Sequence, residues 1–206
     1  MMKHVKAMAA GAVIALGATG AGAATLLDIP AATGALPTDT SVTDVFKAAA
    51  GPGDASFIID GYLSLDGQNY YEDDFGLSLN GKSILTGTFN LGGGGDNVVY
   101  TQPLGSTVTN ISGNGTNVTF AGGQVVVDTP VSLVDGTNLL TFSYTSLAGP
   151  DHAGFQGLGD EGWGVRQIQV TGAAQVPEPA TWAMMLVGFA GLGAALRMRR
   201  ARLAAA

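Results

Sequence analysis

Short runs of β-branched and aromatic residues, separated by turn residues, most limit the folds open to this chain. They include "SFIIDGYLSL", "NVVYTQ", "STVTNI", "TNVTFA", "QVVVDT", "NLLTFSYT" and "GVRQIQVTG". In "DFGLSLNGKSILTGTF", apolar and polar residues alternate on both sides of Asn80-Gly81, which is the strongest short-range signal for a β-hairpin. The pattern predicts an all-β protein whose body, residues 55–176, is an antiparallel β-sandwich.

The first 54 residues divide into two segments. Residues 1–23 have a basic start at Lys3 and Lys6, an apolar stretch and a small-residue cleavage pattern at Ala21-Gly22-Ala23. These three parts predict a secretory signal peptide and therefore export. Residues 24–54 are predicted to be a lead-in with one short helix at about 42–50, which Ser41 or Thr43 caps and Gly51-Pro52 ends.

The segment 177–206 combines three features. Pro177-Glu178-Pro179 precedes seventeen uncharged residues, 180–196, and an arginine cluster follows them. Seventeen residues are at the short limit for crossing a bilayer, and Trp182 stands where an interfacial anchor would. The positive charges predict a transmembrane helix whose C-terminus stays in the cytoplasm. They are Arg197, Arg199, Arg200 and Arg202.

This tail resembles the PEP-CTERM sorting signal in its PEPxxWA form, over residues 177–202. The resemblance identifies Pro177, Glu178 and Pro179 as the recognition motif, Trp182 as the subclass marker and the arginines as stop-transfer charges. It implies that an exosortase cleaves the protein near the motif, after a transient stay in the inner membrane. It also implies export to the cell surface or extracellular matrix of a bacterium that makes exopolysaccharide. It implies no activity, because the bodies of such proteins are diverse.

The body is strongly acidic. Residues 24–176 hold fifteen acidic residues against three basic ones, Lys47, Lys82 and Arg166, which gives a net charge of −12. Such a body repels phosphate backbones, so nucleic acid is excluded as a partner. Cations and neutral polymers such as glycans fit this charge better.

Several motif matches are explained by strands and turns. "GLSLNGKS" fits a phosphate-binding loop, but it alternates like a strand where a helix should begin, so we predict a hairpin. "GLGDEG" fits a dinucleotide-binding pattern, but a strand and not a helix follows it. "LGGGGDNVV" is predicted to be a flexible connection, since one copy of a repeat cannot build a solenoid.

Carboxylates and aromatic residues supply the candidate sites. Four acids that are close in sequence, Asp66, Glu72, Asp73 and Asp74, could bind calcium or belong to a solvated loop. Asp160-Glu161 forms a separate acidic pair. Candidate sugar platforms, or ordinary core and edge aromatics, are Trp163, Tyr70 and Tyr71. Paired carboxylates, or His152 beside Asp151, could act in catalysis, but no nucleophile motif accompanies them, so we predict no catalytic residues.

The order of motifs in residues 55–171 loosely resembles galactose-binding-like and lectin-like jelly rolls. The quoted segments that carry this likeness are "DDFGLSLNGKSI", "VDGTNLLTFSY" and "DEGWGVRQIQVTG". The resemblance implies a non-catalytic surface or matrix protein that contacts extracellular polysaccharide, with calcium as a candidate cofactor. Two alternatives stay open: a structural or adhesive module that assembles with other proteins, and a glycan-active enzyme.

Overall fold

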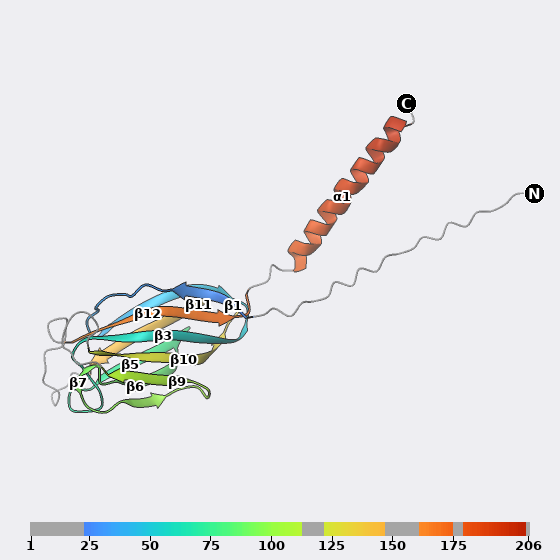
Figure 1. The fold of residues 1–206 in the computed structure, drawn as a ribbon. Helices are drawn as coiled ribbons and strands as arrows, with labels where there is room; N and C mark the ends of the chain where they lie inside the picture. Colours follow the sequence, from blue (N-terminus) through green and yellow to red (C-terminus); the bar gives the residue numbers. More distant parts are fainter. Residues whose placement is uncertain (1–22, 113–121, 147–160, 175–178, 205–206) are drawn as a thin grey trace, which may run out of the picture.

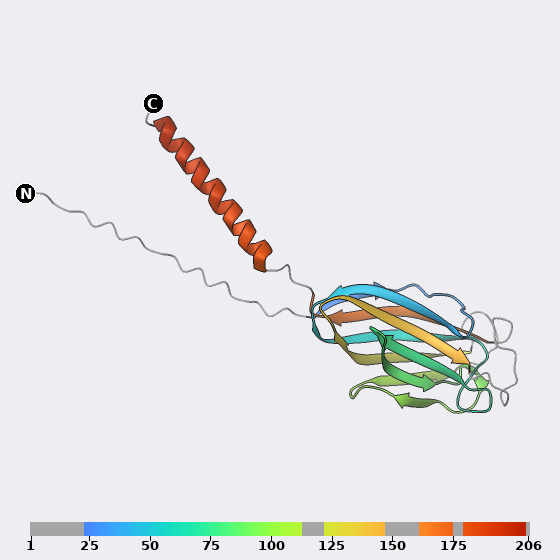
Figure 2. The ribbon, with the colours of Figure 1, turned by 180° about the vertical axis from the view of Figure 1, so that it is seen from behind.

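The computed structural model describes residues 23–112, 122–146, 161–174 and 179–204, and shows two stacked β-sheets and one helix (Figures 1 and 2). The elements in this part of the chain are β1 (Ala24–Ile29), β2 (Thr40–Ala48), β3 (Gly51–Leu63), β4 (Leu65–Asp66), β5 (Asp73–Leu79), β6 (Lys82–Thr88), β7 (Gly92–Gly94), β8 (Val98–Thr101), β9 (Thr107–Ser112), β10 (Gly123–Leu133), β11 (Gly136–Ser146), β12 (Glu161–Gly172) and α1 (Pro179–Ala204). The prediction of an all-β antiparallel sandwich is confirmed.

Strands from the first part of the chain pair with strands from its last part, in antiparallel order, as in one long folded hairpin. Sheet I has the order β1-β12-β3-β10-β9, and sheet II has the order β2-β11-β5-β6-β8. The first strand therefore pairs with the last, β2 with β11, and β3 with β10, all antiparallel. This is the strand arrangement of a jelly roll. A separate parallel pair, β4 with β7, lies at the end of the sandwich where β5 and β12 begin, which we call the loop end.

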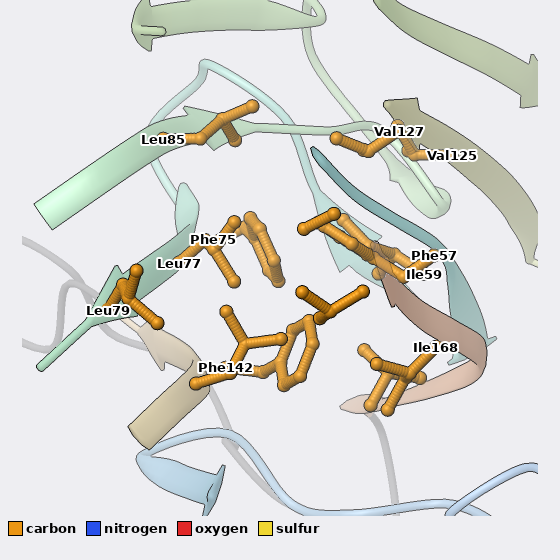
Figure 3. Packing of buried hydrophobic residues seen from close by; sticks show 14 of the residues in the cluster. Phe57, Ile59, Phe75, Leu77, Leu79, Leu85, Val125, Val127, Phe142 and Ile168 are labelled. Carbon is orange, nitrogen blue, oxygen red and sulfur yellow. The ribbon is translucent and has the colours of Figure 1, made fainter. Parts of the chain in front are cut away.

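The core lies between the two sheets and is rich in aromatic rings (Figure 3). Phe57 of sheet I meets Phe142 of sheet II edge to face, with ring centroids 5.0 Å apart. Phe57 also contacts Phe75 at 5.9 Å. Aliphatic side chains from both sheets, such as Ile59 and Leu85, fill the space around them and are fully buried. Alternation along each strand places these residues on the inner face.

The turn at Asn80-Gly81 is the predicted hairpin tip. It joins β5 to β6, and both residues have positive φ, 54° and 76°. This is the backbone of a type I′ turn, whose twist matches that of the flanking strands. The segment Gly76–Ser83 is therefore a hairpin and not a phosphate-binding loop, as predicted.

The short helix predicted at about 42–50 is wrong, because this segment is strand β2. Val42, Phe46 and Ala48 point toward the core, and residues 40–48 pair with β11 along their whole length. Thr43 does not cap a helix, and its hydroxyl instead contacts that of Thr141 at 2.9 Å. Tertiary pairing has overridden a weak local preference.

Two further expectations need correction. The body does not begin at residue 55: β1 and β2 both belong to the sandwich, and residue 55 lies inside β3. The glycine-rich connection includes β7, which pairs with β4. Gly93 packs so tightly there that a Cβ atom would lie 2.7 Å from the carboxylate of Asp66.

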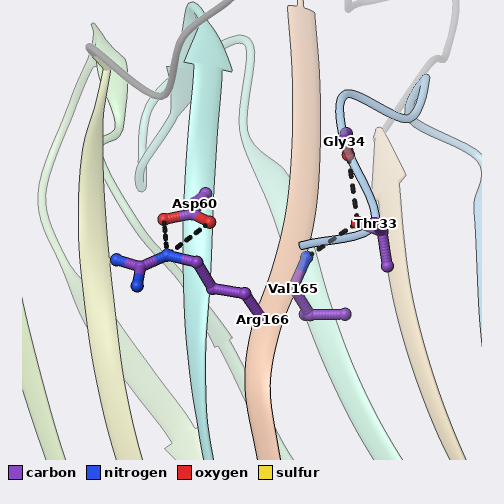
Figure 4. Close-up of polar contacts among 5 residues, drawn as sticks. All are labelled: Thr33, Gly34, Asp60, Val165 and Arg166. Carbon is purple, nitrogen blue, oxygen red and sulfur yellow. Dashed lines mark hydrogen bonds and ion pairs between the residues drawn. The ribbon is translucent and has the colours of Figure 1, made fainter. Parts of the chain in front are cut away.

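One ion pair joins β12 to β3 on the outer face of sheet I (Figure 4). Arg166 donates from Nε to both carboxylate oxygens of Asp60, at 2.9 and 3.1 Å. Asp60 is fully buried, and burial raises its pKa while the guanidinium opposes that change. One of the three basic residues of the body is thus committed to neutralising a buried acid.

We predict that Arg166→Met lowers the free energy of unfolding by about 3 kcal/mol at pH 7, because Asp60 stays buried without its counter-charge. Lowering the pH should reduce this loss, since protonation then removes the uncompensated charge. The double variant Asp60→Asn, Arg166→Met is the matched control and should recover much of the stability. Urea unfolding of the three proteins at pH 5 and pH 7 measures this. Equal losses in the single and double variants would contradict the argument.

Candidate functional site

Three carboxylates from three different strands meet at the loop end of the sandwich. Asp66 ends β4, Asp73 begins β5 and Glu161 begins β12, and carboxylate oxygens of the three lie within 4.8 Å of one another. Asp73 is fully buried and Glu161 is 3% exposed. We call these three residues the acidic cluster.

Hydrogen bonds hold the acidic cluster in place. Asp73 accepts a hydrogen bond from the backbone N–H of Asp66 at 2.9 Å. It accepts another from the hydroxyl of Ser146, which lies directly opposite it on β11. The same hydroxyl lies 3.3 Å from Glu161 and so bridges the two buried carboxylates. Thr88 donates to the backbone oxygens of Asp66 and Asp73. These contacts compensate part of the cost of burying the charges.

The buried environment shifts the protonation of Asp73. Burial raises the pKa of its carboxyl to about 6, and the charges of Asp66 and Asp74 add to the rise, whereas the hydrogen bonds from Ser146 and Asp66 oppose it. A carboxyl group with this pKa exchanges its proton near neutral pH. The acidic cluster can therefore balance its charge by holding a proton or by binding a cation.

The structure divides the four acids that the sequence grouped as a calcium site. Asp66 and Asp73 belong to the acidic cluster, but Asp74 points to the opposite face of β5 because successive strand residues alternate. Glu72 instead accepts a hydrogen bond from the hydroxyl of Tyr100. The third carboxylate of the acidic cluster is that of Glu161, and not that of Glu72 or Asp74. The sequence marked Glu161 as acidic, but only the pairing of β12 beside β3 brings it to this end of the sheet.

The three aromatic residues predicted as sugar platforms have different surroundings. Trp163 is fully buried in the core, contacts the ring of Tyr144, and donates from its indole nitrogen to the backbone oxygen of Pro37 at 2.9 Å. Of the two alternatives, Trp163 is therefore a core aromatic and not an exposed sugar platform. Tyr70 and Tyr71 are about half exposed, and their rings stack edge to face with centroids 5.0 Å apart.

A cavity of about 890 Å³ opens at the other end of the sandwich, where β3 begins and β12 ends. Its wall is formed mainly by small, proline and aliphatic residues. Among the described lining residues, Asp54 and Lys82 are the charged ones. One carboxylate and one amine do not supply the pair of acids that glycoside hydrolysis requires.

Helix α1 contains most of the predicted sorting segment. It begins at Pro179, where a proline suits the first turn, and its apolar side chains are exposed. Trp182 is 52% exposed, and Arg197 is exposed near the other end. Within the described residues, no helix is both long and apolar enough to span a bilayer, so the transmembrane prediction for 180–196 is not confirmed.

Other predicted residues lie outside the described part of the chain. They are Pro177, Glu178, Asp151, His152 and Asp160, together with residues 1–22 of the signal peptide predicted at 1–23. The side chains of Pro179, Arg199, Arg200 and Arg202 belong to the same group, although their backbone lies in α1.

Comparison with protein families decides the nature of the tail. Residues 175–200 match the PEP-CTERM protein-sorting motif. The chain carries a PEP-CTERM sorting signal. The motif indicates an exported protein that is sorted through the membrane and processed by an exosortase, which is a membrane enzyme. A search of curated proteins finds no match to the chain.

We predict that Asp73→Asn changes how the stability of the sandwich depends on pH. The raised pKa means that the folded state holds this proton more tightly than the unfolded chain does. The stabilisation is complete below about pH 4 and is lost as the pH rises through 6, by about 3 kcal/mol at most. The neutral amide can accept from Asp66 and donate to Ser146, so the variant should gain stability relative to wild type as the pH rises. Urea unfolding between pH 4 and pH 7, followed by Trp163 fluorescence, measures this. The control is Asp128→Asn at an exposed position, and parallel curves for Asp73→Asn and wild type would contradict the prediction.

The same variant tests the calcium prediction. A calcium ion that binds the acidic cluster stabilises the folded wild-type protein by mass action, by about 2.7 kcal/mol at a hundredfold excess over its dissociation constant. Asp73→Asn removes one buried ligand oxygen and should lose most of that gain. An unchanged wild-type melting temperature in millimolar calcium would show that a proton, and not this metal, balances the charge.

Proposed function

We propose that the PEP-CTERM protein is exported by its signal peptide, 1–23, and is held briefly in the inner membrane by residues 180–196. An exosortase then cuts it near Pro177-Glu178-Pro179. The mature body reaches the cell surface or extracellular matrix and associates there with polysaccharide, without catalysing a reaction. The observation that carries this proposal is the sorting motif at residues 175–200.

The place of the motif in the fold supports processing. β12 ends at Gly172 and α1 begins at Pro179, so six residues separate the folded body from the helix. Six residues span about 20 Å at most. Pro177 and Pro179 favour an extended backbone, because each fixes its own φ and biases the preceding residue away from helix. A backbone of this kind suits binding by a processing enzyme.

The chemistry of helix α1 supports a transient stay in the membrane. Its exposed apolar side chains include Met184, Leu186, Val187, Phe189 and Leu192, which occupy all sides of the helix. An apolar surface of this kind favours lipid over water. The following arginines resist transfer, since a charge at the centre of a bilayer costs about 2.5–3.5 kcal/mol. Together they form a temporary stop.

The body supports a binding role more than a catalytic one. Asp73 and Glu161 are the closest buried acids, but they are nearly inaccessible and Ser146 bridges them directly. A glycosidase pair is separated by about 5–10 Å and has the substrate between its members. The acidic surface also disfavours polyanions, which leaves neutral glycans as the fitting class.

We predict that the double variant Pro177→Ala, Pro179→Ala is exported but accumulates as an unprocessed precursor in the membrane. The alanines allow helix α1 to extend toward the body, so the enzyme loses the extended backbone it binds. Membrane fractionation and intact mass measurement follow the effect. The control, Pro103→Ala in the loop after β8, should be processed like the wild type.

Two outcomes bear on the proposal directly. Fusion of residues 177–206 to an unrelated exported protein should confer the same processing. If the mature wild-type protein still carries Arg197 to Arg202 by intact mass, the temporary-stop proposal is wrong and the helix is a permanent anchor.

A further inference from the structure

The outer face of sheet II is covered by hydroxyl groups. On β11 the core residues Leu140, Phe142 and Tyr144 are fully buried, so the residues between them point outward. The same alternation holds on the neighbouring strands. We call the outward residues the hydroxyl face; they are Ser41, Thr43, Ser78, Thr86, Thr101, Thr137, Thr141, Ser143 and Thr145.

These side chains form rows across the strands. Thr43 and Thr141 are directly opposite each other, with their hydroxyl oxygens 2.9 Å apart. Thr86 and Thr101 form an equivalent pair at 2.8 Å on β6 and β8. Val45 and Leu139 pair beside the first row and are 60% and 42% exposed. The face therefore offers donors, acceptors and a small apolar patch on one sheet surface.

The hydroxyl face carries few charges for so acidic a body. Among the described outward residues of its strands, the charged ones are Lys47 toward one end and Asp74 at the loop end. Lys82 pairs with the core residue Leu79 and lines the cavity instead. Its centre, around Thr141 and Ser143, is uncharged. Most of the body's fifteen acids thus lie elsewhere, which makes this surface different from the rest of the molecule.

An aromatic ring borders the hydroxyl face at the loop end. Tyr100 of β8 reaches Glu72, which precedes β5, so its side chain crosses β6 between them. The carboxyl group of Glu72 lies next to that of Asp74, which points outward from sheet II. The ring of Tyr100 therefore lies on the outer side and is 43% exposed. The exposed Tyr70 and Tyr71 directly precede Glu72 in the chain.

We propose that the hydroxyl face and Tyr100 bind a neutral polysaccharide chain. An exposed ring presents an apolar face to the C–H groups of a sugar, while hydroxyl and carboxylate oxygens bind its hydroxyl groups. Glu72 and Asp74 beside the ring repel uronic acids and sulfated sugars, so the occupant is uncharged. This inference rests on the proposed function and assigns its polysaccharide contact to one surface.

Substitutions at the centre of the face provide the test. Thr141→Lys places a long charged side chain among the hydroxyl groups, and Thr109→Lys makes the same change at an exposed position on β9 of sheet I. Tyr100→Ala removes the ring, whereas Tyr100→Phe keeps it and removes only the hydroxyl. The full-length protein, in a detergent without sugar groups, is tested by native affinity electrophoresis. The probes are soluble hydroxyethylcellulose, galactomannan and dextran, with alginate as the anionic comparison.

We expect the wild type to be retarded by at least one neutral probe and not by alginate. Thr141→Lys and Tyr100→Ala should weaken this binding by about tenfold, and Thr109→Lys and Tyr100→Phe by less than about threefold. Circular dichroism melts establish that each variant is folded.

The remaining outcomes distinguish failure of the assignment to the hydroxyl face from failure of the proposed polysaccharide association. Equal binding by Thr141→Lys and Thr109→Lys would overturn the assignment to this face and leave polysaccharide association in place. Binding of none of the neutral probes would overturn both the face and the polysaccharide part of the proposed function, but not the sorting. A wild-type dimer in sedimentation analysis that Thr141→Lys dissociates, without glycan binding, would overturn the inference in favour of contact with a second copy.

Discussion

The insertion of the last strand, β12, between β1 and β3 is the constraint on which the rest of the structure depends. It joins β1 to the rest of sheet I, and it brings Trp163 into the core against Tyr144. It also carries Glu161 to the loop end and Arg166 to Asp60. Because β12 is the last strand of the sandwich, the sorting motif follows a chain that is tied on both sides by antiparallel pairing. The described strands of the sandwich therefore all precede the sorting motif in the chain.

Burial of acidic groups recurs in this protein and is balanced in two ways. On the outer face of sheet I, the guanidinium of Arg166 neutralises Asp60. At the loop end no comparable cation is among the described residues around the acidic cluster, and hydroxyl and backbone donors hold Asp73 instead. Burial raises the pKa of Asp73 to about 6, and its hydrogen bonds oppose that rise, whereas at Asp60 the guanidinium of Arg166 opposes the effect of burial. Because the body has three basic residues, most of its acidic groups cannot be neutralised by a positive side chain.

The outer face of sheet II and the surface of helix α1 differ in chemical character. Sheet II presents uncharged hydroxyl groups, and α1 presents apolar side chains on all sides. The hydrophobic core of a sandwich lies between its inner faces, so much of the outer faces is available for contacts of another kind. The helix is not part of the core, and most of it lies within the residues that match the sorting motif, 175–200. Folding and sorting thus depend on different residues of one chain.

Local pattern by itself determined much of this protein. The alternating runs predicted the strands, Asn80-Gly81 predicted the hairpin, and Pro177-Glu178-Pro179 with the following apolar and basic residues predicted the sorting signal, because each depends on neighbours in the chain. Tertiary structure decided what depends on distant partners. Residues 40–48 form β2 because β11 pairs with them, whereas their local sequence also suits a helix. Trp163 is buried and Asp74 is separated from Asp73 because strand alternation takes effect only once a sheet has an inside. Glu161 joins Asp66 and Asp73 across nearly one hundred residues of sequence, and no local pattern encodes such a contact.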